Sequence, residues 1–309
     1  MRRKYRRAVQ PAAPGPAALR VRSFCKVNLA LAVLGRREDG FHEIRTVFQA
    51  IDLHDEIELE RAPRLDVCCS GLLDLPEQDN LVWRAARLIL DTLYPSGGAR
   101  VVLHKRVPVG SGLGGGSSNA AATLLGLCRL YDLRPSEDAL ASMAGALGSD
   151  VPFFLQGGTA LGAGRGNEIR PLPDLPRTDL VVAYPGVRIS TADAYGSLSL
   201  GLTCREGIPK IERFCSRLRQ GVAWPAEIFN DFETSILSAY PAVREAKGAL
   251  MEQGAAAALL SGSGSSVFGF FRNEESALAA SRALTREAWR VFPAKTLSRV
   301  EYSLRMFGS

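Results

Sequence analysis

Several patterns that assign a function at sight are missing from this chain of 309 residues. It holds only three histidines, with no metal-ligand spacing among them, and its six cysteines form no C-x-x-C pair. No uninterrupted apolar run reaches the roughly 18 residues that a membrane span needs, and no secretory signal opens the chain. These absences disfavour a metal-binding module, a disulfide-rich secreted domain and a membrane protein. We therefore expect a cytoplasmic protein with reduced thiols.

Positive charge is also scarce once the first residues are set aside. The net charge of the chain is +6, but residues 1–22 hold seven basic side chains and no acidic one, so the remainder is near −1. This leader is broken by prolines, and we expect it to be a disordered, dispensable basic extension. Three alternatives stay open for this leader: that it contacts nucleic acid, that it contacts a membrane surface, and that the start of the chain is mis-assigned. We expect no nucleic-acid partner for the core.

The common nucleotide motif G-x-x-x-x-G-K-[ST] is absent as well. In its place the segment from Pro108 to Thr123 reads PVGSGLGGGSSNAAAT, with five glycines and three serines before a run of helix formers. Glycine lets a bulky anion approach the backbone, and the free N–H groups at a helix N-terminus suit phosphate. We expect Ser117, Ser118 and Asn119 to cap this helix. The alternatives are a flexible linker and a weak match to the dinucleotide fingerprint G-x-G-x-x-G.

Residues 23–34 alternate in polarity as a β-strand does, which places Lys26 and Asn28 on one face. A lysine inside an apolar strand is unusual, because a buried ammonium needs a counter-charge. The alternative is an edge-strand lysine that prevents aggregation. A turn at residues 35–40 leads to Phe41 and His42, and residues 44–51 and 55–60 predict further strand.

Two helices are predicted on either side of the glycine segment. Asp79 should cap the first, whose apolar positions run from Val82 to Ile89. The second should occupy residues 135–147 and end at Gly148. Asp150 lies just beyond it, in the sequence GSDVPFF. From spacing alone, Asp150 could equally be an ordinary turn aspartate.

The glycine segment resembles the nucleotide loop of the GHMP kinases, P-x-x-x-G-L-G-S-S-A-A. Three other segments resemble that family in order: KVNL followed by DGFH, then GSDVPFF, then SGSG at residues 261–264. The resemblance covers about residues 24–271. It is strongest to the branch that acts on 4-diphosphocytidyl-2-C-methyl-D-erythritol. The matching loop positions are Pro108, Gly112, Leu113, Gly114, Ser117, Ser118 and Ala120, with Gly115 and Gly116 as the glycine-rich variant.

The resemblance implies a two-domain α+β fold, with a ribosomal-protein-S5-like first domain and a ferredoxin-like second domain. The length of the chain also suits about two domains. We expect an ATP-binding domain at residues 23–160, a C-terminal substrate domain at residues 161–309, and the active site between them. The protein would act as a monomer or homodimer.

The resemblance further implies transfer of the γ-phosphoryl of ATP, with Mg²⁺, to the 2-hydroxyl of that substrate in the non-mevalonate isoprenoid pathway. Asp150 would accept the hydroxyl proton and Lys26 would orient Asp150. Phe41, which replaces the tyrosine of the family pattern, would stack on cytosine, with Tyr195 on the opposite face and His42 hydrogen-bonded to the base. For each aromatic residue the alternative is core packing.

The resemblance assigns further contacts to the acceptor and to ATP. It assigns no Mg²⁺ ligand. Asn28 and Thr191 would hold the methylerythritol hydroxyls, while Gly262 and Gly264 would allow close backbone approach. The expected ATP contacts are Asn80, Lys105, Pro108, Gly110, Ser111, Gly112, Leu113, Gly114, Gly115, Gly116, Ser117 and Ser118. For Asn80 and Lys105, a helix cap and a solvated lysine explain the residues equally well.

Two other functions are consistent with parts of this pattern. One is a GHMP kinase for homoserine, mevalonate or a sugar, since all share the loop. The other is a non-catalytic GHMP-like binding protein, or an S5-like nucleic-acid module that uses the basic leader.

Overall fold

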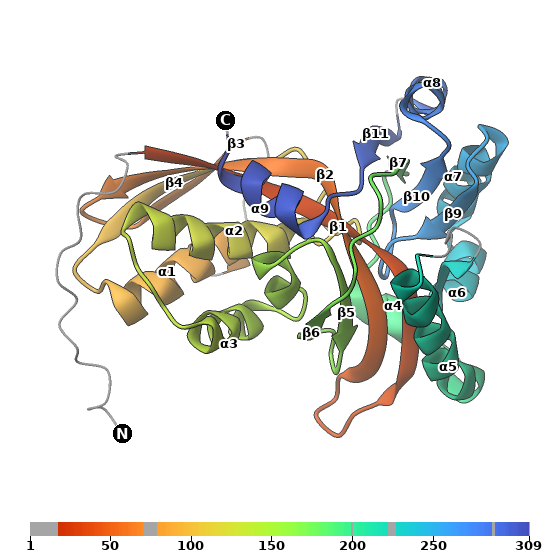
Figure 1. Ribbon diagram of the computed structural model, residues 1–309, viewed down its shortest axis with the longest axis horizontal. Helices are drawn as coiled ribbons and strands as arrows, with labels where there is room; N and C mark the ends of the chain where they lie inside the picture. Colours follow the sequence, from red (N-terminus) through yellow and green to blue (C-terminus); the bar gives the residue numbers. More distant parts are fainter. Residues whose placement is uncertain (1–17, 71–78, 199, 222–226, 286–287, 309) are drawn as a thin grey trace.

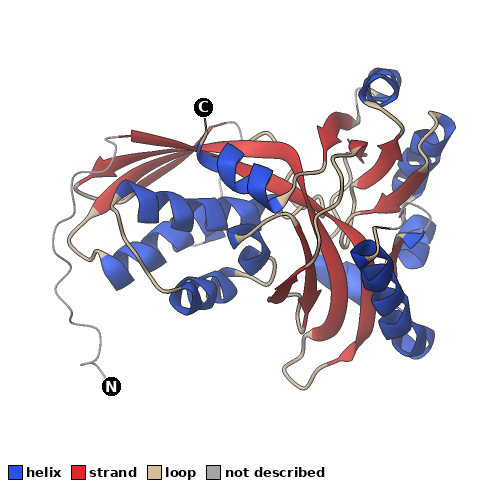
Figure 2. Cartoon of the chain, viewed as in Figure 1, coloured by secondary structure: helices blue, strands red, loops and turns tan. Residues whose placement is uncertain are grey.

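The computed structural model describes residues 18–70, 79–198, 200–221, 227–285 and 288–308. The described strands form two sheets, and helices lie against both (Figures 1 and 2). The first sheet contains β1 (Ala18–Arg36), β2 (His42–Ala62), β3 (Asp66–Ser70), β4 (Gly98–His104), β5 (Thr159–Ala163), β6 (Glu168–Pro171) and β8 (Phe229–Asn230). The second sheet contains β7 (Asp179–Tyr184), β9 (Ala257–Leu260), β10 (Val267–Phe271) and β11 (Arg290–Lys295).

The helices are distributed along the whole described chain. They are α1 (Leu81–Leu93), α2 (Gly115–Leu130), α3 (Glu137–Leu147), the 3-10 helix η2 (Val151–Leu155), α4 (Thr191–Gly196), α5 (Leu200–Arg219), α6 (Glu233–Ala239), α7 (Pro241–Glu252), α8 (Glu274–Leu284) and α9 (Arg299–Phe307). Among the described segments, none of these helices has the length and apolar character needed to cross a bilayer.

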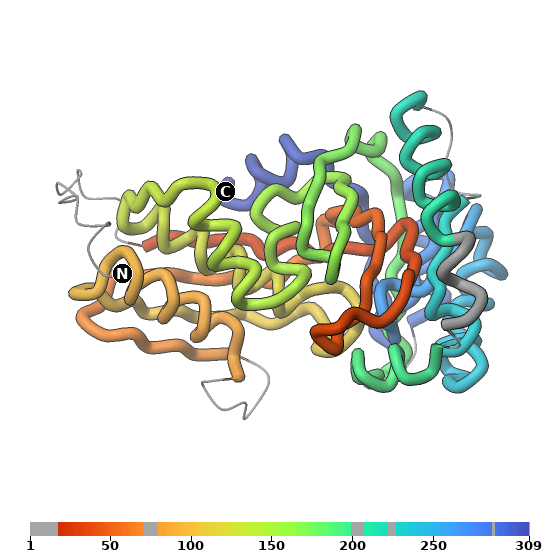
Figure 3. The backbone as a smooth tube through the Cα atoms, turned by 90° about the horizontal axis from the view of Figure 1, so that it is seen from below, coloured from red at the N-terminus to blue at the C-terminus, as the bar shows by residue number. Residues whose placement is uncertain are grey.

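The two longest strands connect the halves of the molecule. β1 has 19 residues and β2 has 21, and they pair antiparallel along nearly their full length. Because β2 is so long, its first half pairs with β5 and its second half pairs with β4. The sheet order is β3-β4-β2-β1-β8; β5 also pairs with β2, and β6 pairs with β5. Figures 1 and 3 show α5 beside the β1–β2 hairpin, where it packs on β1.

The two faces of β1 serve different purposes, as its alternating sequence predicts. Cys25, Val27 and Leu29 belong to a core that also contains Leu180 of β7 and Phe268 of β10. The other face carries Lys26 and Asn28, both almost fully buried. The strand therefore joins the second sheet through one face and presents polar side chains from the other.

β1 also begins earlier than expected. It starts at Ala18, and Arg20 forms an ion pair of 2.8 Å with Glu58 on the neighbouring strand. The prediction of disorder up to residue 22 is therefore wrong for residues 18–22, because the strand pairing continues to Ala18. The remainder of the expected extension, residues 1–17, lies outside the described residues.

The second sheet has the order β11-β7-β10-β9, and every neighbouring pair is antiparallel. Helix α7 precedes β9, and α8 connects β10 with β11. This order of strands and helices is the split β-α-β arrangement of ferredoxin-like domains. Both helices contact this sheet, at the right of Figure 1.

The change from the first sheet to the second comes later in the chain than the expected domain boundary between residues 160 and 161. That boundary falls inside β5, which belongs to the first sheet, whereas the second sheet begins with β7 at Asp179. The C-terminal helix α9 then returns to the first half, where Tyr302 is buried with Phe24 and Phe154. The chain therefore crosses between the two halves more than once.

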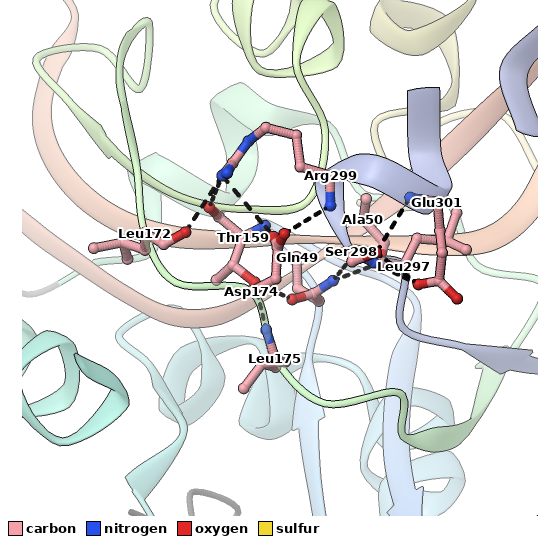
Figure 4. Close-up of polar contacts among 10 residues, drawn as sticks. All are labelled: Gln49, Ala50, Thr159, Leu172, Asp174, Leu175, Leu297, Ser298, Arg299 and Glu301. Carbon is pink, nitrogen blue, oxygen red and sulfur yellow. Dashed lines mark hydrogen bonds and ion pairs between the residues drawn. The ribbon is translucent and has the colours of Figure 1, made fainter. Parts of the chain in front are cut away.

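A buried polar network fixes this return of α9 (Figure 4). Gln49 Nε2 donates to the Leu297 carbonyl at 2.9 Å, and its Oε1 accepts from the Thr159 hydroxyl at 2.6 Å. Asp174 accepts the backbone N–H groups of Thr159 and Arg299 at 3.0 and 2.9 Å. Buried polar groups are costly without partners, so this network holds β2, β5 and the start of α9 in one arrangement.

The predicted helix ends are correct in one case and wrong in two. Ser136 caps α3, which ends before Gly148 as expected. The cap of α1 is Asn80 rather than Asp79, with Asn80 Oδ1 accepting the Val82 N–H at 2.9 Å. Helix α2 starts at Gly115 with Gly114 in the left-handed conformation, so Ser117, Ser118 and Asn119 lie inside the helix and do not cap it.

Candidate active site

A cleft of about 1160 Å³ lies among β1, the start of β2, the glycine segment, α4 and residues 262–264. It gathers most of the predicted site residues, although they are distributed from residue 26 to residue 264. Its lining includes Lys26, Asn28, Phe41, His42, Asn80, Lys105, Pro108, Gly110, Ser111, Gly112, Gly114, Gly115, Gly116, Ser117, Asp150, Thr191, Tyr195, Gly262 and Gly264.

Lys26 and Asp150 meet within this lining. Lys26 Nζ lies 3.6 Å from Asp150 Oδ2, and the two side chains are 4% and 31% exposed. Strand β1 supplies the lysine, and Asp150 immediately precedes η2. Burial lowers the pKa of Lys26, and the carboxylate of Asp150 opposes this effect. The ammonium is therefore desolvated on one side while the carboxylate stays open to the cleft.

The same ammonium joins two further groups. Lys26 Nζ donates to Asn28 Oδ1 at 2.7 Å and to the Gly112 carbonyl at 2.9 Å. An ammonium has three N–H groups; two of them bond to Asn28 and Gly112, and Asp150 is its ion-pair partner at 3.6 Å. Asn28 is held from its other end, because its Nδ2 donates to the Thr46 hydroxyl at 2.7 Å. These contacts fix the lysine, the amide and the glycine loop relative to one another.

The glycine loop packs directly on the C-terminal glycine motif. Ser261 Oγ also donates to the Gly112 carbonyl, at 3.0 Å, and the Ser266 N–H donates to the Ser111 carbonyl at 3.0 Å. A Cβ on Gly112 would lie 2.1 Å from the Ser261 carbonyl oxygen, and one on Gly262 would lie 3.2 Å from Lys26 Nζ. Glycine is required here because two backbones touch.

The N-terminus of α2 provides an anion site. Its cap, Gly114, has φ of 69° and no side chain, and no capping side chain bonds to the first turn. The first N–H groups of a helix lack intrahelical partners and carry the positive end of the helix dipole. Lys105 Nζ lies close by, 3.3 Å from the position that a Cβ on Gly115 would occupy. These donors fit a polyphosphate.

Lys105 is not the solvated lysine of the simpler interpretation, whereas Asn80 is the helix cap that this interpretation expected. Lys105 Nζ lies 2.5 Å from Asp55 Oδ2, and the two side chains are 6% and 0% exposed. Asp55 Oδ1 accepts the N–H groups of Arg106 and Val107 at 2.7 and 2.8 Å. Asp55 thus holds the chain just before the glycine loop. Asn80 both caps α1 and lines the cleft.

Two predicted ATP contacts do not face the cleft. Leu113 is fully buried in the core shared with the second sheet. Ser118 is 1% exposed; its hydroxyl donates to the Phe24 carbonyl at 2.6 Å, and its N–H bonds to Gly114. The Ser111 hydroxyl donates to the Pro108 carbonyl at 2.8 Å. Ser117 also lines the cleft, and among the described residues no hydrogen bond engages its hydroxyl.

The aromatic residues are arranged differently from the expected pair around a base. Tyr195 stacks on His42, with ring centroids 4.3 Å apart and planes at 15°. The ring of Phe41 is instead covered by the Arg165 guanidinium at 4.6 Å, and Phe41 is 51% exposed. The stack has a physical reason: Tyr195 also packs edge-on against Phe232, which holds it beside His42.

Protonation at this end of the cleft follows from burial. Burial lowers the pKa of His42, and the charge of Arg36 lowers it further. Burial likewise raises the pKa of Tyr195 to about 12, with a contribution from Asp150. Both rings are therefore neutral near pH 7, and His42 can donate and accept hydrogen bonds. Thr191 lines the same end, at the first turn of α4.

The profile of the GHMP kinase N-terminal domain matches residues 80–158, and that of the GHMP kinase C-terminal domain matches residues 213–291. A curated protein of Solibacter usitatus named 4-diphosphocytidyl-2-C-methyl-D-erythritol kinase is 44% identical over 261 residues, or 82% of this chain and 81% of that protein. The chain belongs to the GHMP kinase family. Membership in this kinase family implies the use of ATP, and the expected two-domain α+β fold is confirmed.

Other comparisons agree with this assignment. A protein of Pelobacter propionicus with the same name as the Solibacter protein is 39% identical, over 91% of this GHMP kinase and 99% of that protein. A crystal structure of 4-(cytidine 5'-diphospho)-2C-methyl-D-erythritol kinase has a TM-score of 0.75 and 34% identity, over 90% of this chain and 99% of that chain. Homoserine kinase from Cytophaga hutchinsonii, with a TM-score of 0.73 and 19% identity over 94% and 99% of the two chains, shares the fold.

Three residues in or beside the cleft of this GHMP kinase escaped the sequence analysis: Asp55, Arg36 and Arg165. Asp55 had a readable signal, because it is in phase with Ile57 and Leu59 on the buried face of β2. A carboxylate in that phase needs a partner. Arg36 is the last residue of β1 and Arg165 lies in the turn between β5 and β6, and the local sequence around neither one shows that it lines a cleft.

Proposed function

We propose that this chain transfers the γ-phosphoryl group of ATP to the 2-hydroxyl of 4-diphosphocytidyl-2-C-methyl-D-erythritol, the step of the non-mevalonate isoprenoid pathway named by its relatives. The observation that carries the proposal is the Lys26–Asp150 pair beside the glycine loop. Relatives at 39–44% identity over most of the chain share one name, which supports this acceptor over the other acceptors of the family.

Asp150 accepts the proton of the acceptor hydroxyl as its oxygen attacks the γ-phosphorus. The bond between that phosphorus and the β–γ bridging oxygen breaks, and ADP leaves. Asp150 can act in this way because its carboxylate is open to the cleft on the side away from Lys26. Lys26 fixes the carboxylate through its charge and holds the glycine loop through the Gly112 carbonyl. A general base contributes about 10²- to 10⁴-fold to the rate.

The N–H groups at the start of α2 and the ammonium of Lys105 bind the phosphates of ATP, while Asn80 lies at the adenosine end. No cluster of three or more metal-ligating side chains occurs among the described residues. Mg²⁺ is often held by substrate phosphates with few protein ligands, and the Ser117 hydroxyl at the phosphate site suits this mode. Mg²⁺ would supply charge neutralisation on the phosphates.

His42, Phe41 and Tyr195 form the cytidine end. A neutral His42 can bond to the base edge, and the exposed ring of Phe41 offers a stacking surface worth roughly 1 to 3 kcal/mol per base. Asn28 and Thr191 lie toward the methylerythritol hydroxyls, and Gly262 and Gly264 keep the backbone close to them. We further propose a cytoplasmic enzyme, active as a monomer or homodimer, whose core needs no nucleic acid.

The proposal is tested with purified protein, Mg²⁺ and radiolabelled ATP against a panel of acceptors. The panel holds 4-diphosphocytidyl-2-C-methyl-D-erythritol, homoserine, mevalonate and galactose. We expect phosphate transfer to the first acceptor at a kcat/KM at least about 10⁴ M⁻¹s⁻¹, and none to the others. Preferential transfer to another acceptor would refute the proposed acceptor. ATP binding without transfer to any acceptor would refute the proposed phosphotransfer activity.

A further inference from the structure

The cleft is lined by four strongly basic side chains, Lys26, Arg36, Lys105 and Arg165. Two of them are already committed. Lys26 is bonded to Asn28, Gly112 and Asp150, and Lys105 is paired with the buried Asp55. Neither Arg36 nor Arg165 forms an ion pair with a carboxylate of the described ranges. They are therefore the two cations of the cleft that have no carboxylate partner within those ranges.

Two acidic residues close to Arg36 along the chain, Asp39 and Glu43, are paired with another cation. Arg37 Nε lies 3.2 Å from Asp39 Oδ2, and Arg37 Nη1 lies 2.6 Å from Glu43 Oε2. Neither Arg36 nor Arg165 forms an ion pair with these two carboxylates, although the charge of Arg165 acts on Asp39 from a longer distance. A cleft wall with unpaired arginines favours a ligand with phosphate groups.

Both arginines lie beside the proposed base site. Arg36 is the pairing partner of His42 in the β1–β2 ladder, and its charge acts on the imidazole. Arg165 lies in the turn between β5 and β6, with its guanidinium 4.6 Å from the centre of the Phe41 ring. The Ile44 N–H donates to the Gly164 carbonyl at 2.8 Å, which ties this turn to β2. The two cations are thereby placed next to Phe41 and His42.

We infer that Arg36 and Arg165 bind the diphosphate of the acceptor, the group that joins its cytidine to the reacting polyol. This inference rests on the proposed function. The cytidine end lies at His42 and the transfer site lies at Asp150, so the diphosphate passes through the cleft between them. Arg36 and Arg165 thus select nucleoside diphosphate esters over acceptors that lack phosphate, separately from the phosphate site at the N-terminus of α2.

The test compares Arg36→Met and Arg165→Met with wild-type protein and with Arg170→Met as a matched control. Arg170 is an exposed arginine of β6 that does not line the cleft. Methionine keeps an apolar chain over Phe41 and removes only the charge. Binding of cytidine, CMP and CDP is measured by calorimetry with a saturating non-hydrolysable ATP analogue, which keeps these ligands out of the ATP site.

We expect each cleft variant to weaken CDP binding about tenfold, which corresponds to about 1.4 kcal/mol, and to leave cytidine binding nearly unchanged. The acceptor KM should rise by the same factor at constant kcat, because the lost contact is made equally in the ground and transition states. The control should match wild type. Equal losses for cytidine and CDP, or no loss for CDP, would overturn the assignment.

Failure of this inference is distinguishable from failure of the proposed function. If wild-type protein phosphorylates the acceptor and binds CDP more tightly than cytidine while both variants behave like wild type, only the arginine assignment is wrong. If wild-type protein neither binds cytidine ligands nor phosphorylates the acceptor, the proposed function itself is wrong and the inference falls with it.

Discussion

Gly112→Ala tests whether the contact between the glycine loop and the C-terminal glycine motif positions the reacting groups. Gly112 has φ of 79°, and a Cβ there would lie 2.1 Å from the Ser261 carbonyl oxygen and 2.9 Å from that of Gly264. Both atoms belong to backbone, so the clash cannot be relieved by a side-chain rotation. Since ordinary contact begins at 3.4 Å, the loop must move by about 1 Å, and a 1 Å misplacement of reacting groups costs about 10²-fold in rate.

The positive φ itself also costs energy, so a control must separate strain from the clash. Gly254 has φ of 88°, a Cβ added there would meet no atom within 4 Å, and the residue lies outside the cleft. In both alanine variants the left-handed conformation costs about 1 to 2 kcal/mol of stability. Only Gly112→Ala also displaces the acceptor of the Lys26 hydrogen bond.

The assay is steady-state ADP release with both substrates saturating, together with thermal unfolding of each variant. We expect kcat to fall about 100-fold in Gly112→Ala and to stay near wild type in Gly254→Ala, while the melting temperature falls in both variants and falls further in Gly112→Ala. Equal kcat values for the two variants would refute the argument that this backbone contact sets the geometry of the site.

Two further predictions concern protonation and the buried ion pair. Because the pKa of His42 is lowered below its usual 6.5, the imidazole stays neutral down to pH 6.5 and becomes charged only below it. The acceptor KM should therefore rise in that acidic range while the KM for ATP stays constant. Arg36→Met should move the rise in acceptor KM to higher pH. A KM that rises above pH 7 instead would contradict this. Lys105→Met should destabilise the fold by about 3 to 5 kcal/mol in urea unfolding, because it leaves Asp55 as an uncompensated buried charge. Removal of the exposed Arg87 ion pair should cost under about 1 kcal/mol. Similar losses for both variants would contradict the structural importance of the buried Lys105–Asp55 pair.

Local signals in the sequence predicted the parts of the fold that depend on neighbouring residues. The alternation of residues 23–34 correctly predicted the shared face of Lys26 and Asn28, whose side chains are joined by a 2.7 Å hydrogen bond. Gly148 correctly predicted the C-terminal end of α3. The start of α2 was misplaced, since three glycines in a row indicate a loop, whereas Gly115 and Gly116 are helical here.

The arrangement of the site depends on contacts between distant segments, which spacing along the chain does not reveal. That Lys26 and Asp150 lie together was expected only from the family resemblance, since they are brought together by α2, which packs on both β1 and η2. The stacking of Tyr195 on His42 depends on Phe232, far along the chain, and was not predictable from the residues next to Tyr195. The Arg165–Phe41 contact arises in the same way, from a turn that docks on β2.

The most direct test of the central claim, that Lys26 and Asp150 flank the hydroxyl that is phosphorylated, is the turnover number of Asp150→Asn with saturating ATP and acceptor. Asparagine keeps the shape of the side chain but cannot accept the proton. We predict a kcat that falls by about 10²- to 10⁴-fold while CDP binding stays close to wild type. A kcat near that of wild type would contradict the account, because the proton would then leave through another group.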